Sequence, residues 1–85
     1  MLNAIVLIKA TPAQVSTLGP ALAALDGVSE VYSVTGDDDL VALLHSNDTE
    51  QVARLVTERI ATLDGVLDTR TLIAFRQYDP ADISF

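Results

Sequence analysis

The chain has no cysteine and only one histidine among its 85 residues. Without cysteine there can be no disulfide, no thiolate chemistry and no sulfur-ligated metal site. The sequence also lacks a nucleophile elbow, a phosphate-binding loop, zinc-ligand spacing and a paired-carboxylate motif. We therefore interpret His45 as a partly exposed polar residue rather than a catalytic base, and we expect no enzymatic activity, no cofactor and no metal centre.

Basic residues are scarce as well. Five Lys and Arg stand against twelve Asp and Glu, so the formal net charge is -7. A surface of this sign repels phosphate groups, which disfavours direct binding to nucleic acid or to anionic membranes. The largely apolar run over residues 1–8 is too short to cross a bilayer, and it has neither the basic start nor the cleavage site of a signal peptide. We therefore expect a cytoplasmic protein.

The tetrapeptide Leu-Asp-Gly-Val occurs twice, at residues 25–28 and 63–66, and the two copies lie 38 residues apart. Each copy follows an apolar pattern with helical spacing and precedes one with the alternation of a strand. A junction repeated at this distance in a short chain indicates that one supersecondary unit has been used twice.

Four strands and two helices are expected around these junctions. The strands are predicted over residues 2–8, 28–35, 40–44 and 66–75, and the helices over residues 11–25 and 47–63. The first and third strands are apolar on both faces, as strands covered on both sides are, whereas the mixed patterns of the second and fourth favour sheet edges. This order predicts an α+β fold: a ferredoxin-like βαββαβ sandwich, with a four-stranded antiparallel sheet and two helices on one face.

Local signals give the expected ends of the helices. Thr11, which proline follows, resembles an N-cap with Gln14 as its capping-box partner. Asn47 and Glu50 form a second capping box. Pro20 removes a helical hydrogen-bond donor, so we predict a kink or an early break in the first helix.

One face of the predicted sheet is left without a covering helix. Since the central strands are apolar on both sides, a second copy packed on that face would bury the remaining apolar side chains. At 85 residues a single core is also marginal, so self-association is expected. The pattern leaves residues 76–85 open. Asp79 and Pro80 could cap a short turn carrying Ile83 and Phe85, or the segment could reach across to a neighbouring subunit.

Three carboxylates gather beside a glycine in the segment Thr35-Gly36-Asp37-Asp38-Asp39, at the turn between the second and third strands. Three adjacent Asp side chains cannot all point to one side, and the alternation and trailing glutamate of a calcium loop are absent, so a metal site is not favoured. The segment is either a solvated acidic turn or a site for a small ligand that carries an ammonium group.

Two threonines on the fourth strand form the other candidate site. Thr69 and Thr71 are two residues apart, so their hydroxyls face the same way and Arg70 faces the other way. They could bind a carboxylate or an amide, or they could be present only because threonine forms strands well. The same alternation puts Val28 and Tyr32 on one face of the second strand.

Several segments taken together resemble the effector domain of the Lrp/AsnC regulators, also called the regulation of amino-acid metabolism (RAM) domain. The likeness runs over about residues 3–78 and is carried by residues 31–40, 63–66, 69–71 and 73–76. The resemblance implies a ferredoxin-like domain of the dimeric α+β barrel type, which dimerises through its sheet and forms larger rings, often octamers. It also implies that amino acids or similar small effectors bind between dimers, near the Gly-x-x-Asp turn.

The ligand-binding residues that the resemblance implies are Thr35, Gly36, Asp37, Asp39, Thr69 and Thr71. In this assignment Asp37 and Asp39 bind the ammonium group of the ligand, and the threonine hydroxyls and the backbone amides around Gly36 bind its carboxylate. Asp38 departs from the family, in which many members have an aromatic or aliphatic residue at that position.

Full-length members of the family carry an N-terminal winged helix-turn-helix, whereas this sequence starts at the first strand of the effector domain. We therefore expect a single stand-alone domain over residues 1–85, without a DNA-binding domain. We expect it to form a homodimer that assembles into an octamer and to sense an amino acid in that form. It would modulate transcription indirectly through assembly with a full-length Lrp/AsnC regulator.

Two alternative functions stay open. One is a dimeric α+β barrel enzyme, a small monooxygenase or isomerase, for which Tyr32, His45 and Arg70 are the candidate groups. The other is an ACT-like regulatory domain or a purely structural oligomerisation module.

Overall fold

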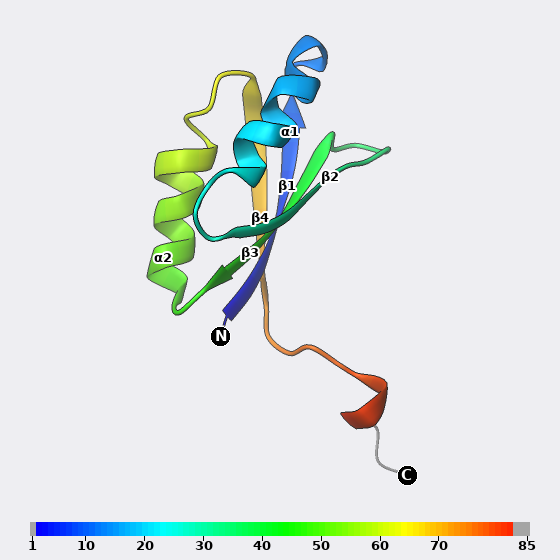
Figure 1. Ribbon diagram of the computed structural model, residues 1–85, viewed down its shortest axis with the longest axis vertical. Helices are drawn as coiled ribbons and strands as arrows, with labels where there is room; N and C mark the ends of the chain where they lie inside the picture. The colour runs from blue at the N-terminus through cyan, green and yellow to red at the C-terminus, as the bar shows by residue number, and fades with distance from the viewer. Residues whose placement is uncertain (1, 83–85) are drawn as a thin grey trace.

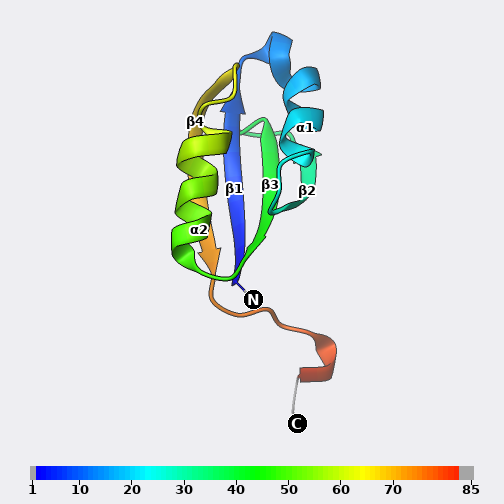
Figure 2. The ribbon, with the colours of Figure 1, turned by 60° about the vertical axis from the view of Figure 1, so that its left-hand side comes forward.

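A four-stranded antiparallel sheet with two helices on one face makes up the computed structural model, which describes residues 2–82 (Figure 1 and Figure 2). The strands are β1 (Leu2–Ala10), β2 (Val28–Ser33), β3 (Leu40–Ser46) and β4 (Val66–Ala74). The helices are α1 (Val15–Ala23), which follows a 3-10 turn over Pro12–Gln14, and α2 (Thr49–Arg54), which continues as a π-helical segment over Leu55–Ile60. A last 3-10 turn spans Pro80–Asp82.

The order of strands in the sheet is β2-β3-β1-β4, and every neighbouring pair is antiparallel. β1 lies in the middle, where Ile5 stands opposite Leu43 of β3 on one side and Leu72 of β4 on the other. The strands predicted to be central are central, and the strands predicted at the edges lie at the edges. The ferredoxin-like α+β sandwich is therefore confirmed.

The two Leu-Asp-Gly-Val junctions have the same conformation. Gly27 has a φ of 94° and Gly65 a φ of 96°, values that residues with a side chain rarely adopt. In each junction the valine amide donates to the leucine carbonyl, at 3.2 Å in both copies. The glycine carbonyls then accept from the ends of the central strands, with His45 N donating to Gly27 O at 2.9 Å and Thr11 N to Gly65 O at 2.8 Å. The sequence repeat is therefore a structural repeat.

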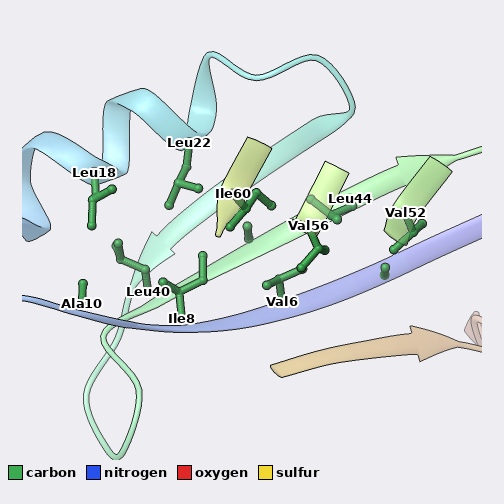
Figure 3. Close-up of a cluster of buried hydrophobic side chains, with 12 residues drawn as sticks. Val6, Ile8, Ala10, Leu18, Leu22, Leu40, Leu44, Val52, Val56 and Ile60 are labelled. Atoms are coloured by element: carbon green, nitrogen blue, oxygen red, sulfur yellow. The ribbon is translucent and has the colours of Figure 1, made fainter. Parts of the chain in front are cut away.

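The hydrophobic core lies between the helices and the sheet (Figure 3). Its buried residues are Ala4, Val6, Ile8, Ala10, Leu18, Leu22, Leu40, Ala42, Leu44, Val52, Val56 and Ile60. All of them are aliphatic, and the aromatic residues among those described, Tyr32, Phe75 and Tyr78, are exposed. The aromatic side chains are thus available to interfaces rather than to the core.

The predicted capping boxes are wrong in detail. Thr11 makes no side-chain cap, and Gln14 instead donates from Nε2 to Asp64 Oδ2 at 2.9 Å, which ties the start of α1 to the second junction. For α2 the N-cap is Asp48 rather than Asn47, and its Oδ1 accepts from Gln51 N at 2.8 Å. A charged carboxylate is well suited to the positive end of a helix, which explains the shift by one residue.

The early break predicted at Pro20 does not occur, because α1 continues through it to Ala23. The proline removes one helical hydrogen-bond donor. Leu18 and Leu22, on either side of it, are both buried in the core and hold the helix by packing.

A β-bulge changes the faces of β2. The register shifts between Val28 and Glu30, so Val28 and Val31 both pack on the core while Tyr32 lies on the other face. The strict alternation that put Val28 with Tyr32 is therefore wrong. On β4 the predicted faces hold around the threonines, since Thr69 and Thr71 pair with the buried residues Ile8 and Val6 of β1.

Beyond β4, residues 75–82 run away from the sheet (Figure 1). Of the two alternatives for this segment, the short turn is present and spans Pro80–Asp82, with Asp79 Oδ1 accepting from Ala81 N at 2.9 Å. Ile83 and Phe85, which the turn alternative included, lie outside the described residues. No helix in the described part of the chain is long and apolar enough to span a bilayer.

Candidate functional site

The acidic segment forms the loop between β2 and β3, over residues 34–39, and Asp39 fixes it in place. The Asp39 amide donates to Ile8 O at 2.9 Å, and its Oδ2 accepts from Ala10 N at 2.8 Å. Val34 N donates to Asp39 O at 3.0 Å and closes the loop. Asp39 therefore ties the loop to the end of β1.

Asp38 holds the other side of the same loop. Its Oδ2 accepts from the Arg70 guanidinium at 2.6 Å, and the Asp38 side chain is only 11% exposed, against 60% for Arg70. The hydrogen bond and the negative charge of Asp38 raise the pKa of Arg70 above its ordinary value, and the charges of Asp37 and Asp68 add to this. This ion pair connects the loop to β4, across the intervening strand β1.

Gly36 and Asp37 form the free tip of the loop. Gly36 has a φ of 117°, and a Cβ built on it would meet nothing within 4 Å, so open space lies beside the backbone. Asp37 is exposed and makes no side-chain hydrogen bond or ion pair within residues 2–82, and neither does Thr35. The tip therefore offers a carboxylate beside an exposed glycine, on a loop that is anchored at both sides.

Thr69 and Thr71 lie on the helix-covered side of β4, opposite Ile8 and Val6. Thr71 borders an apolar hollow of about 340 Å³ beside α2, together with Val52 and Val56. Arg70 points to the uncovered side of the sheet, where it meets Asp38. Within one protomer the structure thus joins Asp38 to Arg70 and Asp39 to Ala10, and it leaves the two threonines on the opposite face from Arg70.

Arg70 is the functional candidate that the site prediction omitted. A signal for it exists in the sequence, because alternation places it opposite Thr69 and Thr71 and the strand order puts β4 beside β1. The sequence does not show that the Asp38 side chain extends across β1 to contact Arg70. That contact depends on the register of three strands.

Replacing Arg70 by alanine is expected to loosen the loop, since it leaves the nearly buried Asp38 carboxylate without its partner. Amide hydrogen exchange at Val34 and Asp39, whose amides are hydrogen-bonded at the two ends of the loop, should speed up roughly two- to fivefold, the range for an ion pair open to solvent on one side. Arg54→Ala is the matched control, because it removes the exposed Arg54–Glu50 pair on α2. Unchanged loop exchange in Arg70→Ala would show that the pair does not hold the loop.

The uncovered side of the sheet, here called the open face, is apolar at its centre. Its side chains come from all four strands: Ile5, Leu7, Tyr32, Val41, Leu43 and Leu72. Leu72 and Tyr32 are each 52% exposed. A face of this kind is typical of a surface that a partner covers.

The groups available to an enzyme on the open face do not converge. Tyr32 donates to Glu30 Oε2 at 2.8 Å, and this hydrogen bond, with the charge of Glu30, raises the pKa of the Tyr32 phenol. His45 Nδ1 lies 2.5 Å from Asn3 Oδ1. The register puts Arg70 opposite Leu7 and His45 opposite Asn3, four residues or about 13 Å apart along β1. No group of residues suited to hold a metal ion occurs among those described.

Comparison with known proteins gives consistent matches over almost the whole chain. Residues 3–82 match the sequence model of the Lrp/AsnC ligand binding domain. The chain is 30% identical over 79 residues to the HTH-type transcriptional regulator LysM of Saccharolobus solfataricus, and the match covers 91% of this chain and 54% of that regulator. The chain thus spans about half the length of this curated relative.

Two solved structures are similar as well. TTHA0845 from Thermus thermophilus has a TM-score of 0.88 and 49% identity, over 93% of this chain and 99% of that chain. The feast or famine regulatory protein of M. tuberculosis, complexed with L-methionine, has a TM-score of 0.80 and 26% identity, over 99% of this chain and 56% of that chain.

Proposed function

Because the chain belongs to the family of Lrp/AsnC ligand-binding domains, we propose that it senses an amino acid and passes the signal on through its assembly with other copies. The family consists of regulators rather than enzymes, in agreement with the non-enzymatic interpretation. Support for an amino-acid ligand comes from the M. tuberculosis relative, whose structure is a complex with L-methionine. The observation that carries the proposal is the anchored acidic loop with its free tip.

In this proposal the loop tip recognises the two charged groups that all free amino acids share. Asp37, which is unpaired within residues 2–82, binds the ammonium group, and the Oδ1 atom of Asp39 is the second acceptor. The backbone amides around Gly36 bind the carboxylate, and the open space beside the Gly36 Cα leaves room for the ligand. Thr35 lines the entrance, and Asp38 and Arg70 hold the loop in shape.

Thr69 and Thr71 enter the site differently. Since they face the helix side of their own sheet, they contribute only where a neighbouring protomer brings its β4 against the loop of the first. A site shared in this way would couple ligand binding to assembly, because the ligand contacts both protomers. We therefore assign the two threonines to a site completed between copies.

The assembly that we propose is a homodimer joined through the open faces, which forms a higher oligomer, an octamer. The apolar side chains of the open face support this, since they lie uncovered in the single protomer. The chain would act as one ligand-binding unit over residues 1–85, located in the cytoplasm, and would modulate transcription indirectly by joining a full-length regulator of the same family.

A thermal-shift screen of the twenty amino acids against the full chain tests this function. We expect at least one amino acid to raise the melting temperature, and Asp37→Asn to remove that rise because the substitution removes the charge that pairs with the ammonium group. Asp26→Asn, an exposed aspartate of the first junction, is the matched control and should respond as the unsubstituted chain does. Equal stabilisation of Asp37→Asn and the unsubstituted chain would rule out the proposed site.

A further inference from the structure

Residues 75–82, here called the tail, leave the fold at the end of β4 and extend away from the sheet (Figure 2). Phe75 in the tail is fully exposed and Tyr78 is 77% exposed. The side-chain hydrogen bond that the described tail makes, between Asp79 and Ala81, is internal to it. Two aromatic side chains are thus held in solvent on a segment that nothing in its own protomer covers.

The tail begins over the open face. Arg76 and Gln77 line a hollow of about 500 Å³, whose other walls include Ile5 and Leu43 of the open face and Glu30 of β2. A second copy that covers the open face therefore meets the start of the tail, where Arg76 and Gln77 lie. The tail is in this way continuous with the proposed interface.

We propose that the tail of each protomer packs across the open face of a second copy of the chain, with Phe75 and Tyr78 as its anchors. The proposal rests on the proposed pairing of open faces and names the segment that completes it. The partner's hollow receives the aromatic side chains, and the two tails cross between the protomers in a two-fold arrangement.

Net charge alone does not favour a second copy, because the tail carries Asp79 and Asp82 against Arg76, so a local contact has to supply the attraction. Each protomer carries a formal net charge of -7, so two copies repel one another unless opposite charges meet at the interface. Arg76 is the basic residue of the tail, and Glu30 lies on the wall of the hollow with its Oε2 bound to Tyr32 and its Oε1 unpaired within residues 2–82. Arg76 of one protomer and Glu30 of the other then form an ion pair at the margin of the apolar contact.

The area that the tails contribute is large for so small a protein. A buried aromatic side chain covers about 150–250 Å². Two such side chains from each tail therefore bury roughly 600–1,000 Å² in a dimer, out of the roughly 1,600 Å² typical of a stable interface. The tails thus supply a substantial share of the area of an ordinary interface.

Removing the tail tests the proposal. A chain that ends at Ala74 keeps all core residues, and by sedimentation equilibrium its dimer dissociation constant should rise roughly tenfold or more. Phe75→Ser combined with Tyr78→Ser should have the same effect in the full-length chain, while Ala81→Ser should leave the constant unchanged. An unchanged constant in the shortened chain and in the double variant would overturn tail docking and leave the open-face dimer standing. A full-length chain that stays monomeric at every concentration would overturn both proposals.

Cross-linking distinguishes packing on a second copy from packing on the tail's own sheet. The chain has no cysteine, so Tyr78→Cys and Ser29→Cys, beside the hollow, can be placed in separate chains and mixed under oxidising conditions. We expect a disulfide-linked heterodimer. The contrary result is an intramolecular disulfide in a chain that carries both substitutions, with no disulfide between the separate chains. It would show that the tail folds back on its own protomer and would overturn the proposal.

Discussion

Asp39→Ala should abolish the response to the effector and also lower the stability of the fold. The substitution removes the carboxylate oxygen that accepts from the Ala10 amide and leaves that amide without its partner at the end of β1. Loss of a hydrogen bond to a charged acceptor in a partly buried place costs about 1–3 kcal/mol of the free energy of unfolding. The loop would then be tied to β1 only by the backbone bond to Ile8 O, and the amides around Gly36 would be held less firmly for a carboxylate.

Asp39→Asn separates the anchoring role from the charge. The side-chain amide keeps an oxygen that can accept from Ala10 N, so the stability measured by urea unfolding should fall by less than in Asp39→Ala. Binding of the amino acid should still weaken, because the second acceptor for its ammonium group has lost its charge. If Asp39→Ala unfolds at the same urea concentration as the unsubstituted chain, Asp39 does not anchor the loop.

Among the glycine-to-alanine substitutions, Gly65→Ala should lower the free energy of unfolding most. Gly65 has a φ of 96°, which costs a residue with a side chain about 1–3 kcal/mol. The added Cβ would lie 2.7 Å from Gln14 Oε1, so Gln14 must move and give up its hydrogen bond to Asp64. We therefore expect the free energy of unfolding to fall by roughly 2–4 kcal/mol, the sum of backbone strain and overpacking.

Two other glycines provide the controls for this experiment. Gly27→Ala has nearly the same φ but a milder contact, 3.1 Å to Leu55 Cδ2 at the end of a flexible side chain, so it should cost less. Gly19→Ala, inside α1 and with nothing within 4 Å of its Cβ, should raise stability by about 0.5–1 kcal/mol. Urea unfolding of the three variants checks the order, and equal losses in all three would contradict the role given to the junctions.

The fold was predictable because its signals are local and repeated. Apolar content on both faces marked β1 and β3 as central strands, and the two Leu-Asp-Gly-Val junctions marked a unit used twice. The details that were missed depend on geometry between segments. The bulge in β2 arises from its pairing with β3, and the N-cap of α2 is decided by competition between the neighbours Asn47 and Asp48.

The candidate site was predictable only in part. The sequence identified the acidic loop as a group of residues, and only the family resemblance set Asp38 apart from Asp37 and Asp39. The structure gives each a different position, with Asp39 bound to a backbone amide 29 residues away, Asp38 bound to Arg70, and Asp37 unpaired within residues 2–82. These differences depend on where the chain returns in space, which no pattern within the loop records.

Hydrogen exchange of the assembled chain, measured with and without the amino acid that stabilises it most, tests the central claim most directly. We predict slower exchange over residues 34–39 in the presence of the amino acid, and loss of this protection in Asp37→Asn. Protection confined to the hollow beside Leu43 and His45, or no change with any of the twenty amino acids, would contradict the claim that the loop between β2 and β3 is the effector site.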